Sequence, residues 1–145
     1  MPAQFTDTTQ FGLVMRFEVD VAGIDLGSWS SCDGLRVDFG LKEIKSGGNN
    51  DFKVYLPDRV FYPKLVLKRA MNLADSARLM GWLRSMVDSM EGDTATITLK
   101  DSHDQKVAEW TFASVRPFAW KGPTLNATGK EVAVEMLELV HEGFL

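Results

Sequence analysis

The chain has 145 residues, of which 45% are hydrophobic and 25% are charged, and its formal net charge is −4. A chain of this size and composition can bury the core of one domain without a metal or a disulfide, so a disordered protein is excluded. The acidic balance argues against nucleic-acid coating and sequence-specific nucleic-acid binding, because both need clustered basic residues.

The cysteine count and the N-terminal sequence bear on the compartment. Cys32 is the only cysteine, so no intrachain disulfide can form, which favours assembly in a reducing cytoplasm. The start of the chain, MPAQFTD, lacks the basic and apolar segments of a secretion signal. No stretch approaches the roughly 20 apolar residues that a membrane span needs. We therefore expect no membrane anchor.

The first third of the chain predicts two amphipathic strands after a polar arm. Residues 1–11 are polar and aperiodic, so we expect a flexible N-terminal arm on a single domain that spans 1–145. Apolar and polar residues alternate from Leu13 to Val21, which is the period of a half-buried strand. Ala22 to Gly27 contains two glycines and predicts a hairpin turn. A second alternation predicts a strand from Leu35 to Leu41.

The middle of the chain predicts a loop and then a helix. Residues 46–51, SGGNND, are turn formers and predict a mobile loop that projects from the sheet. A short strand is expected around Leu65 and Leu67. Asn72 offers a capping side chain for a helix that Gly92 would end. The expected apolar stripe of this helix consists of Leu79, Leu83, Met86, Val87 and Met90.

The last third predicts three further strands. Alternation is clear from Thr94 to Lys100, and apolar positions recur from Val107 to Val115 and from Lys130 to Val140. Pro117 to Gly129 contains two prolines and two glycines, which predicts a long connection. The order of elements indicates a mainly β domain with one α-helix, an α+β fold.

No group of residues has the spacing of a catalytic, cofactor-binding or metal site. His103 and His141 are far apart in the chain, and neither has metal-ligand spacing with Cys32. Residues 102–104, SHD, could suggest a nucleophile and a base, but neighbours in a turn do not face one another. Cys32 is more typical of a small core residue than of a reactive thiol. We expect no enzyme, no cofactor and no metal.

Three further features have competing interpretations. Gly47-Gly48 could form an anion-binding nest, but it lacks the following helix of a phosphate loop. Met80, Met86 and Met90 could line a binding groove, but packing against the sheet is favoured. The pair Lys68-Arg69 could meet an acidic partner, but we expect two charges at a strand end to be solvated.

A series of landmark residues, mostly aromatic, glycine, proline and strand positions, follows the order of one known family from Gly12 to Gly143. These landmarks are Phe17-Glu18-Val19, Gly23, Trp29, Cys32-Asp33-Gly34-Leu35, Glu43, Gly47-Gly48, Asn50, Leu56-Pro57, Tyr62, Leu65 to Arg69, Trp82, Trp110-Thr111-Phe112, Pro117, Trp120, Pro123, Leu125, Val132 to Leu139, His141 and Gly143. In this ordered set the chain resembles the tail-tube proteins of contractile phages and extracellular contractile injection systems.

The resemblance implies a fold and a function, which we state as expectations. The fold is a small antiparallel β-barrel or sandwich with one helix, the tail-tube (haemolysin-coregulated-protein-like) fold, forming a hexameric ring. The function is that of a structural subunit of the inner tube of a contractile phage-tail-like injection system, stacking as rings into a channel for cargo delivery. Implied partners are further copies of the chain, the sheath protein, and baseplate and cap proteins, with a cargo protein allowed in the lumen. Assembly would occur in the bacterial cytoplasm. The chain would be a component of a phage tail or of a phage-tail-like particle that can be released from the cell.

Stacked rings need contacts between rings, and loops with few internal contacts can supply them. The loop expected to do so comprises Ser46, Gly47, Gly48, Asn49, Asn50, Asp51 and Phe52. An alternative of the same fold is a baseplate-proximal tube initiator or adaptor, which should stop at one ring. An alternative of another class, a small enzyme or ligand-binding barrel, would need a pocket with converging polar groups, and the sequence indicates none.

Overall fold

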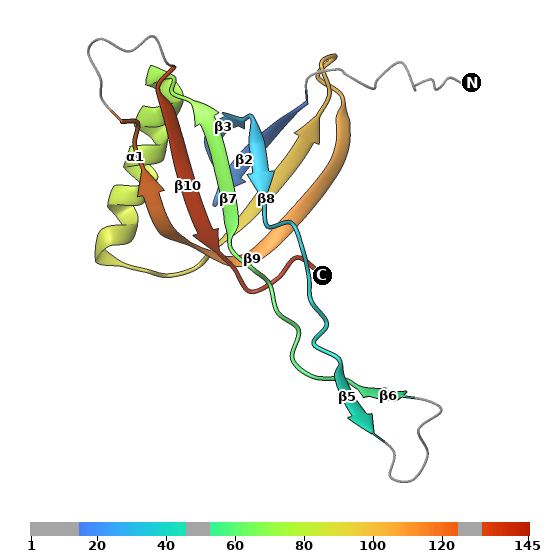
Figure 1. Cartoon of the computed structure of the whole chain (residues 1–145). Helices are drawn as coiled ribbons and strands as arrows, with labels where there is room; N and C mark the ends of the chain where they lie inside the picture. The colour runs from blue at the N-terminus through green and yellow to red at the C-terminus, as the bar shows by residue number, and fades with distance from the viewer. Residues whose placement is uncertain (1–14, 46–52, 125–131) are drawn as a thin grey trace.

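A computed structural model describes residues 15–45, 53–124 and 132–145. They form a curled antiparallel sheet with a helix on one flank and a separate two-stranded ladder that projects from the body (Figure 1). The arm expected at residues 1–11 lies outside the described residues. The elements are β2 (Arg16–Val21), β3 (Ile24–Trp29), β4 (Ser31–Asp33), β5 (Lys42–Lys45), β6 (Lys53–Leu56), β7 (Leu65–Ala70), α1 (Leu73–Asp88), β8 (Asp93–Lys100), β9 (Lys106–Lys121) and β10 (Val134–Val140).

The main sheet has seven strands in the order β3-β2-β8-β9-β10-β7-β4, and each pair of neighbours is antiparallel. Its two end strands, β3 and β4, are separated in the chain only by Ser30, so the sheet curls until its ends approach. The Ser30 amide donates to the Lys68 carbonyl at 2.9 Å, which ties this junction to β7. The mainly antiparallel β fold is as expected. Among the described strands, β3 and β7 form no ladder, so the barrel is not closed.

The core lies inside the curl and beneath the helix. Alternate residues of each strand point inward, as a period of two requires, and inward residues of neighbouring strands meet in register. Val19 of β2 lies opposite Ile97 of β8, and Leu137 of β10 lies opposite Leu67 of β7. The buried apolar residues are Val19, Val21, Leu26, Trp29, Leu65, Leu67, Leu79, Trp82, Met86, Ala95, Ile97, Phe112, Val115, Leu137 and Leu139.

The helix begins where the sequence predicts and ends earlier. The Asn72 side chain accepts hydrogen bonds from the amides of Ala74 and Asp75 at 3.0 and 3.2 Å, which confirms it as the N-cap. The helix ends at Asp88 with Ser89 as its C-cap, so the expected end at Gly92 is wrong. The buried helix residues are Ser76, Leu79, Trp82 and Met86.

The apolar stripe that we expected on this helix is partly wrong. Leu79 and Met86 are buried, whereas Val87 is 78% and Met90 54% exposed. The buried positions Leu79, Trp82 and Met86 are three and four residues apart, so they lie on one face of the helix. Val87 comes one residue after Met86 and is therefore rotated away from the core. Met90 lies beyond the helix end. Two exposed apolar residues therefore remain at this end of the helix.

The strand expected from Leu35 to Leu41 is also wrong. Only an isolated bridge between Asp38 and Phe61 forms there, and the short strands β5 and β6 follow instead. Positive φ angles at Gly34 and Gly40 interrupt the extended backbone on which the alternating pattern depends. The segment leaves the body rather than adding a strand to the sheet (Figure 1).

Strand β9 is longer than the sequence predicts. It continues through Pro117 to Lys121, where we expected a connection. Proline cannot donate to a ladder, and the register between β9 and β10 shifts next to the pair Leu139 and Pro117, so a bulge accommodates the missing donor. This extension places Trp120 beneath the helix.

Candidate functional site

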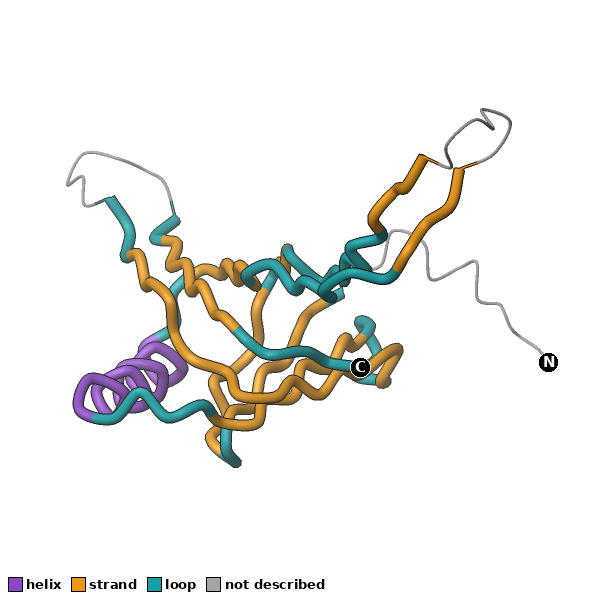
Figure 2. Tube along the Cα trace, turned by 90° about the horizontal axis from the view of Figure 1, so that it is seen from below, coloured by secondary structure: helices purple, strands orange, loops and turns teal. Residues whose placement is uncertain are grey.

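A two-stranded arm projects from the body of the molecule (Figures 1 and 2). We define it as residues 35–45 and 53–64, which include β5 and β6. Exposed large apolar side chains concentrate on it, although an isolated two-stranded ladder is marginally stable in water. The arm therefore needs a partner surface. Its exposed apolar residues are Phe39, Leu41, Ile44, Val54, Tyr55, Leu56, Val60 and Phe61.

The loop for which we expected inter-ring contacts belongs to this part of the chain. Residues 46–52 lie outside the described residues. The strands that precede and follow them are β5 and β6 of the two-stranded arm. The inter-ring role of this loop therefore stays a prediction, and the sequence analysis missed the two flanking strands and their exposed apolar side chains.

Backbone contacts join the two segments at the base of the two-stranded arm. Asp38 and Phe61 exchange hydrogen bonds of 2.9 and 2.7 Å between their amides and carbonyls. Gly34 has a φ of +93°, and a Cβ there would lie 1.9 Å from the Lys64 carbonyl oxygen. The two segments can approach this closely only because position 34 has no side chain.

An aromatic cluster fastens the base of the arm to the C-terminal segment. The Tyr62 ring lies 5.4 Å from the rings of both His141 and Phe144, and Phe112 lies 4.8 Å from His141. Burial lowers the pKa of His141, and the Pro63 carbonyl only partly offsets this. A neutral His141 therefore packs as one of four aromatic rings.

A buried ion pair fixes the helix against the sheet. Arg69 of β7 and Glu135 of β10 are register partners, and Arg69 Nε donates to Glu135 Oε2 at 2.7 Å. Ser76 of α1 donates to the same oxygen at 2.7 Å, and Trp120 Nε1 donates to Oε1 at 3.0 Å. The Arg69 guanidinium also lies 3.9 Å from the centre of the Trp29 ring. Five elements, β3, β7, β9, β10 and α1, thus meet at one carboxylate and one guanidinium.

The environment of Glu135 keeps it ionised. Burial acts to raise the pKa of Glu135, but hydrogen bonds from Ser76, Arg69 and Trp120, together with the Arg69 charge, outweigh burial and lower the pKa below its ordinary value. Our expectation that Arg69 would be solvated is wrong, because Arg69 is only 3% exposed.

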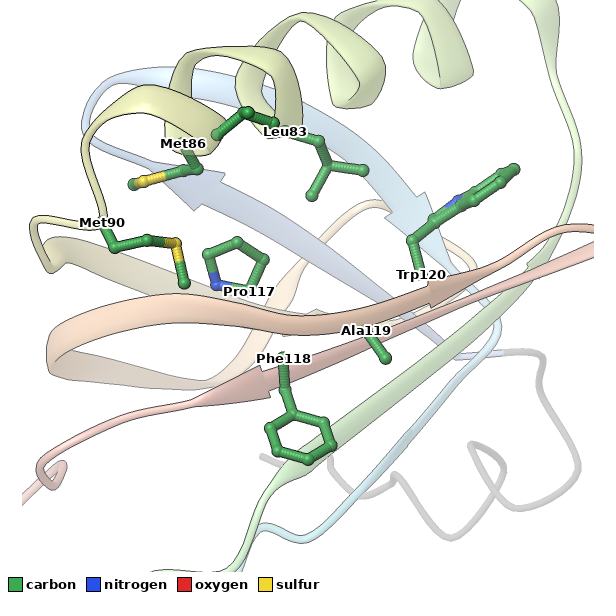
Figure 3. A pocket seen from close by; sticks show the side chains of 8 residues that line it. Leu83, Met86, Met90, Pro117, Phe118, Ala119 and Trp120 are labelled. Carbon is green, nitrogen blue, oxygen red and sulfur yellow. The ribbon is translucent and has the colours of Figure 1, made fainter.

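An apolar groove opens between the C-terminal end of α1 and strand β9 (Figure 3). Its volume is about 250 Å³. Pro117 and Trp120 point toward the helix, whereas the Phe118 ring points away from it (Figure 3). The groove is lined by Leu83, Met86, Val87, Met90, Pro117, Phe118, Ala119 and Trp120. Met86 is buried in the core as expected but also lines the groove, and Met90 lines the groove as well, the interpretation that we favoured less.

The outward face of the sheet carries paired charges. Glu138 accepts a hydrogen bond from Lys64 at 2.8 Å, and Lys121 lies 3.5 Å from its other carboxylate oxygen. The Lys64 hydrogen bond is the main cause that lowers the pKa of Glu138. At the other end of the sheet, Lys100 pairs with Glu18 at 2.6 Å. These ion pairs place charged side chains on the outward face of the sheet.

The residues that we considered as catalytic or metal-binding candidates lie apart from one another in the structure. The His103 amide donates to Asp101 Oδ1 at 2.9 Å in an exposed turn. Burial, with a smaller effect of Asp33, raises the pKa of Cys32 to about 12, so its thiol is protonated near neutral pH. Within the described residues, no three His, Cys, Asp or Glu side chains gather as metal ligands, and no helix is long and apolar enough to cross a membrane.

A sequence comparison now identifies the family. The model of the T4-like virus tail tube protein gp19 family matches residues 14–145. The chain belongs to this family. Tail tube proteins are structural proteins, and no residue of the chain needs to carry out a reaction in that role. No curated protein matches the chain by sequence.

Solved structures with the tail-tube fold resemble the chain over nearly its whole length. A chain in the sheath-tube complex of the PVC extracellular contractile injection system has a TM-score of 0.74 and 20% identity, over 97% of this chain and 96% of that one. A chain in the 6-fold symmetrised baseplate of the anti-feeding prophage has a TM-score of 0.71 and 21% identity, over 99% and 93%. Hcp1 from Salmonella typhimurium has a TM-score of 0.58 and 12% identity, over 89% and 83%. The expected tail-tube fold is confirmed.

Proposed function

We propose that this chain is the inner-tube subunit of a contractile phage-tail-like injection system, in which six copies form a ring and rings stack around a channel. Membership of the tail tube family is the observation that carries the proposal. The 6-fold symmetry of the anti-feeding prophage baseplate, which contains a chain of the same fold, supports a ring of six.

The two-stranded arm and the sheet edges support repeated assembly. The arm exposes eight large apolar side chains, and the open ends of a curled sheet present backbone groups that a neighbouring copy can pair with. A heterologous contact of this kind closes a ring or builds a filament, whereas a self-complementary contact stops at a dimer.

The proposal includes the domain organisation and the partners. Residues 1–145 form a single domain in this proposal. The sheath surrounds the tube, baseplate and cap proteins bind its ends, and a cargo protein fits in the lumen. Assembly takes place in the bacterial cytoplasm, before the particle is released. The sheath-tube, baseplate and cap complexes that contain chains of this fold support these partners.

The loop at residues 46–52 makes the contacts between rings in this proposal. Deletion of residues 47–50 should therefore leave rings intact and abolish their stacking into tubes, as measured by tube length in electron micrographs. Tubes of unchanged length would contradict the role of this loop and leave the ring itself unaffected.

A baseplate adaptor is the second candidate, because a chain in the anti-feeding prophage baseplate resembles this one almost as strongly as a chain in a sheath-tube complex does. Sedimentation velocity and native mass spectrometry of the purified chain separate the two. A tube subunit should give hexamers and multiples of hexamers that grow with concentration. An adaptor should stop at one ring.

A further inference from the structure

The two-stranded arm has one apolar face. In the β5–β6 register, Ile44 lies opposite Val54 and Lys42 lies opposite Leu56, so these four residues share a face. Ile44, Val54 and Leu56 are 40%, 39% and 45% exposed. The face is an apolar strip with one lysine at its edge.

The groove between α1 and β9 suits side chains rather than a small molecule. Its volume of about 250 Å³ is below the roughly 300 to 1,000 Å³ of small-molecule pockets. All eight of its lining residues are apolar, so no polar side chain is available to orient a ligand. Val87 and Met90 at its rim are 78% and 54% exposed, which leaves apolar surface to cover.

The charges beside the two surfaces are complementary. The last turn of α1 contains no basic residue and ends in Asp88, followed by Glu91, at the negative end of the helix dipole. Arg116 compensates part of this charge, because its Nε donates to the Met90 carbonyl at 2.8 Å. Among the described residues neither Lys42 nor Asp88 has an ion-pair partner. A lysine on one apolar surface thus matches an aspartate at the rim of the other.

The groove is held in shape before anything binds. Trp120, which forms its inner wall, donates to Glu135, and Glu135 is fixed by Arg69 and by Ser76 of the helix. The N-terminal half of the helix, through Ser76, and β9, through Trp120 of the groove, are therefore linked by one carboxylate. A preformed site loses less conformational freedom on binding.

Within one molecule the two surfaces are apart. The two-stranded arm and the helix lie on opposite sides of the body in both views (Figures 1 and 2). Resting on the tube function proposed above, we propose that the α1–β9 groove of one copy receives the apolar face of the two-stranded arm of a second copy, with Lys42 against the other copy's Asp88. The contact is heterologous, so every copy gives an arm and offers a groove.

Disulfide cross-linking tests this contact in the full chain. The variant Val54→Cys with Val87→Cys, in a Cys32→Ala background, should form a ladder of covalent multimers on a non-reducing gel after mild oxidation of assembled particles. The control is Val54→Cys with Leu73→Cys. Leu73 is 90% exposed and lies at the other end of the same helix, about 21 Å from position 87, too far for a disulfide at the same contact.

The outcomes separate this inference from the function on which it rests. Assembled rings or tubes with no ladder, or with equal ladders in both variants, would overturn the arm-to-groove contact and leave the tube function intact. A wild-type chain that never assembles would overturn both. A sheath protein that occupies the groove would instead protect Val87→Cys from cross-linking only in sheathed particles.

Charge reversal supplies a second readout without cysteines. Lys42→Glu and Asp88→Lys should each raise the concentration at which half of the chain is assembled, by roughly two- to fivefold. The double variant restores the opposite charges, so its midpoint should return to within about twofold of the wild-type value. Additive defects in the double variant would contradict the Lys42–Asp88 contact. Circular dichroism of each variant checks that the fold is retained.

Discussion

At the scale of single residues, Arg69 and Glu135 occupy positions that alternation assigns to the core. Arg69 follows Leu65 and Leu67 at intervals of two, and Glu135 precedes Leu137 and Leu139 in the same way. A charged residue on an apolar strand face needs an opposite charge nearby. The sequence contains this signal, but it does not show that the two strands are neighbours, so we interpreted Arg69 as solvated.

Removal of Glu135 should strongly destabilise the protein. Glu135→Ala leaves the buried Arg69 guanidinium without its counter-charge and should lower the free energy of unfolding by about 3 to 5 kcal/mol, as measured by urea denaturation at pH 7. Glu109→Ala is the matched control, since Glu109 pairs with Lys106 at the surface and its loss should be barely detectable. Equal effects of the two substitutions would contradict the role of the buried pair.

Gly34 and Gly23 form a matched pair of glycines with positive φ. Both alanine variants incur the conformational cost of the left-handed region, about 1 to 2 kcal/mol. Only at Gly34 does the new Cβ collide with backbone, since nothing lies within 4 Å of the Cβ position at Gly23. Thermal unfolding should show a clearly larger loss for Gly34→Ala than for Gly23→Ala. Equal losses would mean that the base of the arm is not closely packed.

At the scale of elements, the strands with a buried face and the helix start could be predicted, and the two-stranded arm could not. Alternation in Thr94 to Lys100 reports burial on one side, and β8 occupies that range almost residue for residue. The same alternation from Leu35 to Leu41 does not produce a strand, because positive φ angles at Gly34 and Gly40 interrupt the extended backbone. Periodicity indicates which residues avoid water, but not whether their partner lies in the same chain.

The aromatic cluster at the base of the arm should make stability depend on pH. The folded-state pKa of His141 lies below the ordinary value, so the unfolded chain binds the proton more readily. Stability should therefore fall as pH is lowered from about 6.5 toward the folded pKa. The melting temperature of His141→Phe should vary less with pH between 5 and 7 than that of the wild type.

This pH window separates His141 from the acidic residues. Glu135 and Glu138 also have lowered pKa values, but their contributions to stability are lost only below about pH 4.5, as they become protonated. A wild-type melting temperature that stays constant between pH 5 and 7, or an identical slope in His141→Phe, would contradict a buried neutral histidine.

At the scale of the whole molecule, the family could be identified from ordered landmarks, whereas the exposed apolar surfaces of the two-stranded arm and the α1–β9 groove could not. Gly34 and Trp29 are landmarks because backbone packing and the core require them, so they report the fold. Val87 looked like a core residue because an exposed apolar residue and a buried one are alike in sequence. The groove became visible only once the helix end and the extended β9 were placed together.

The central claim is that this chain assembles with itself into a tube, and negative-stain electron microscopy of the purified full chain over a series of concentrations tests it most directly. We expect six-fold rings that stack into tubes of growing length as the concentration rises. A folded chain that remains monomeric at every concentration would contradict the account.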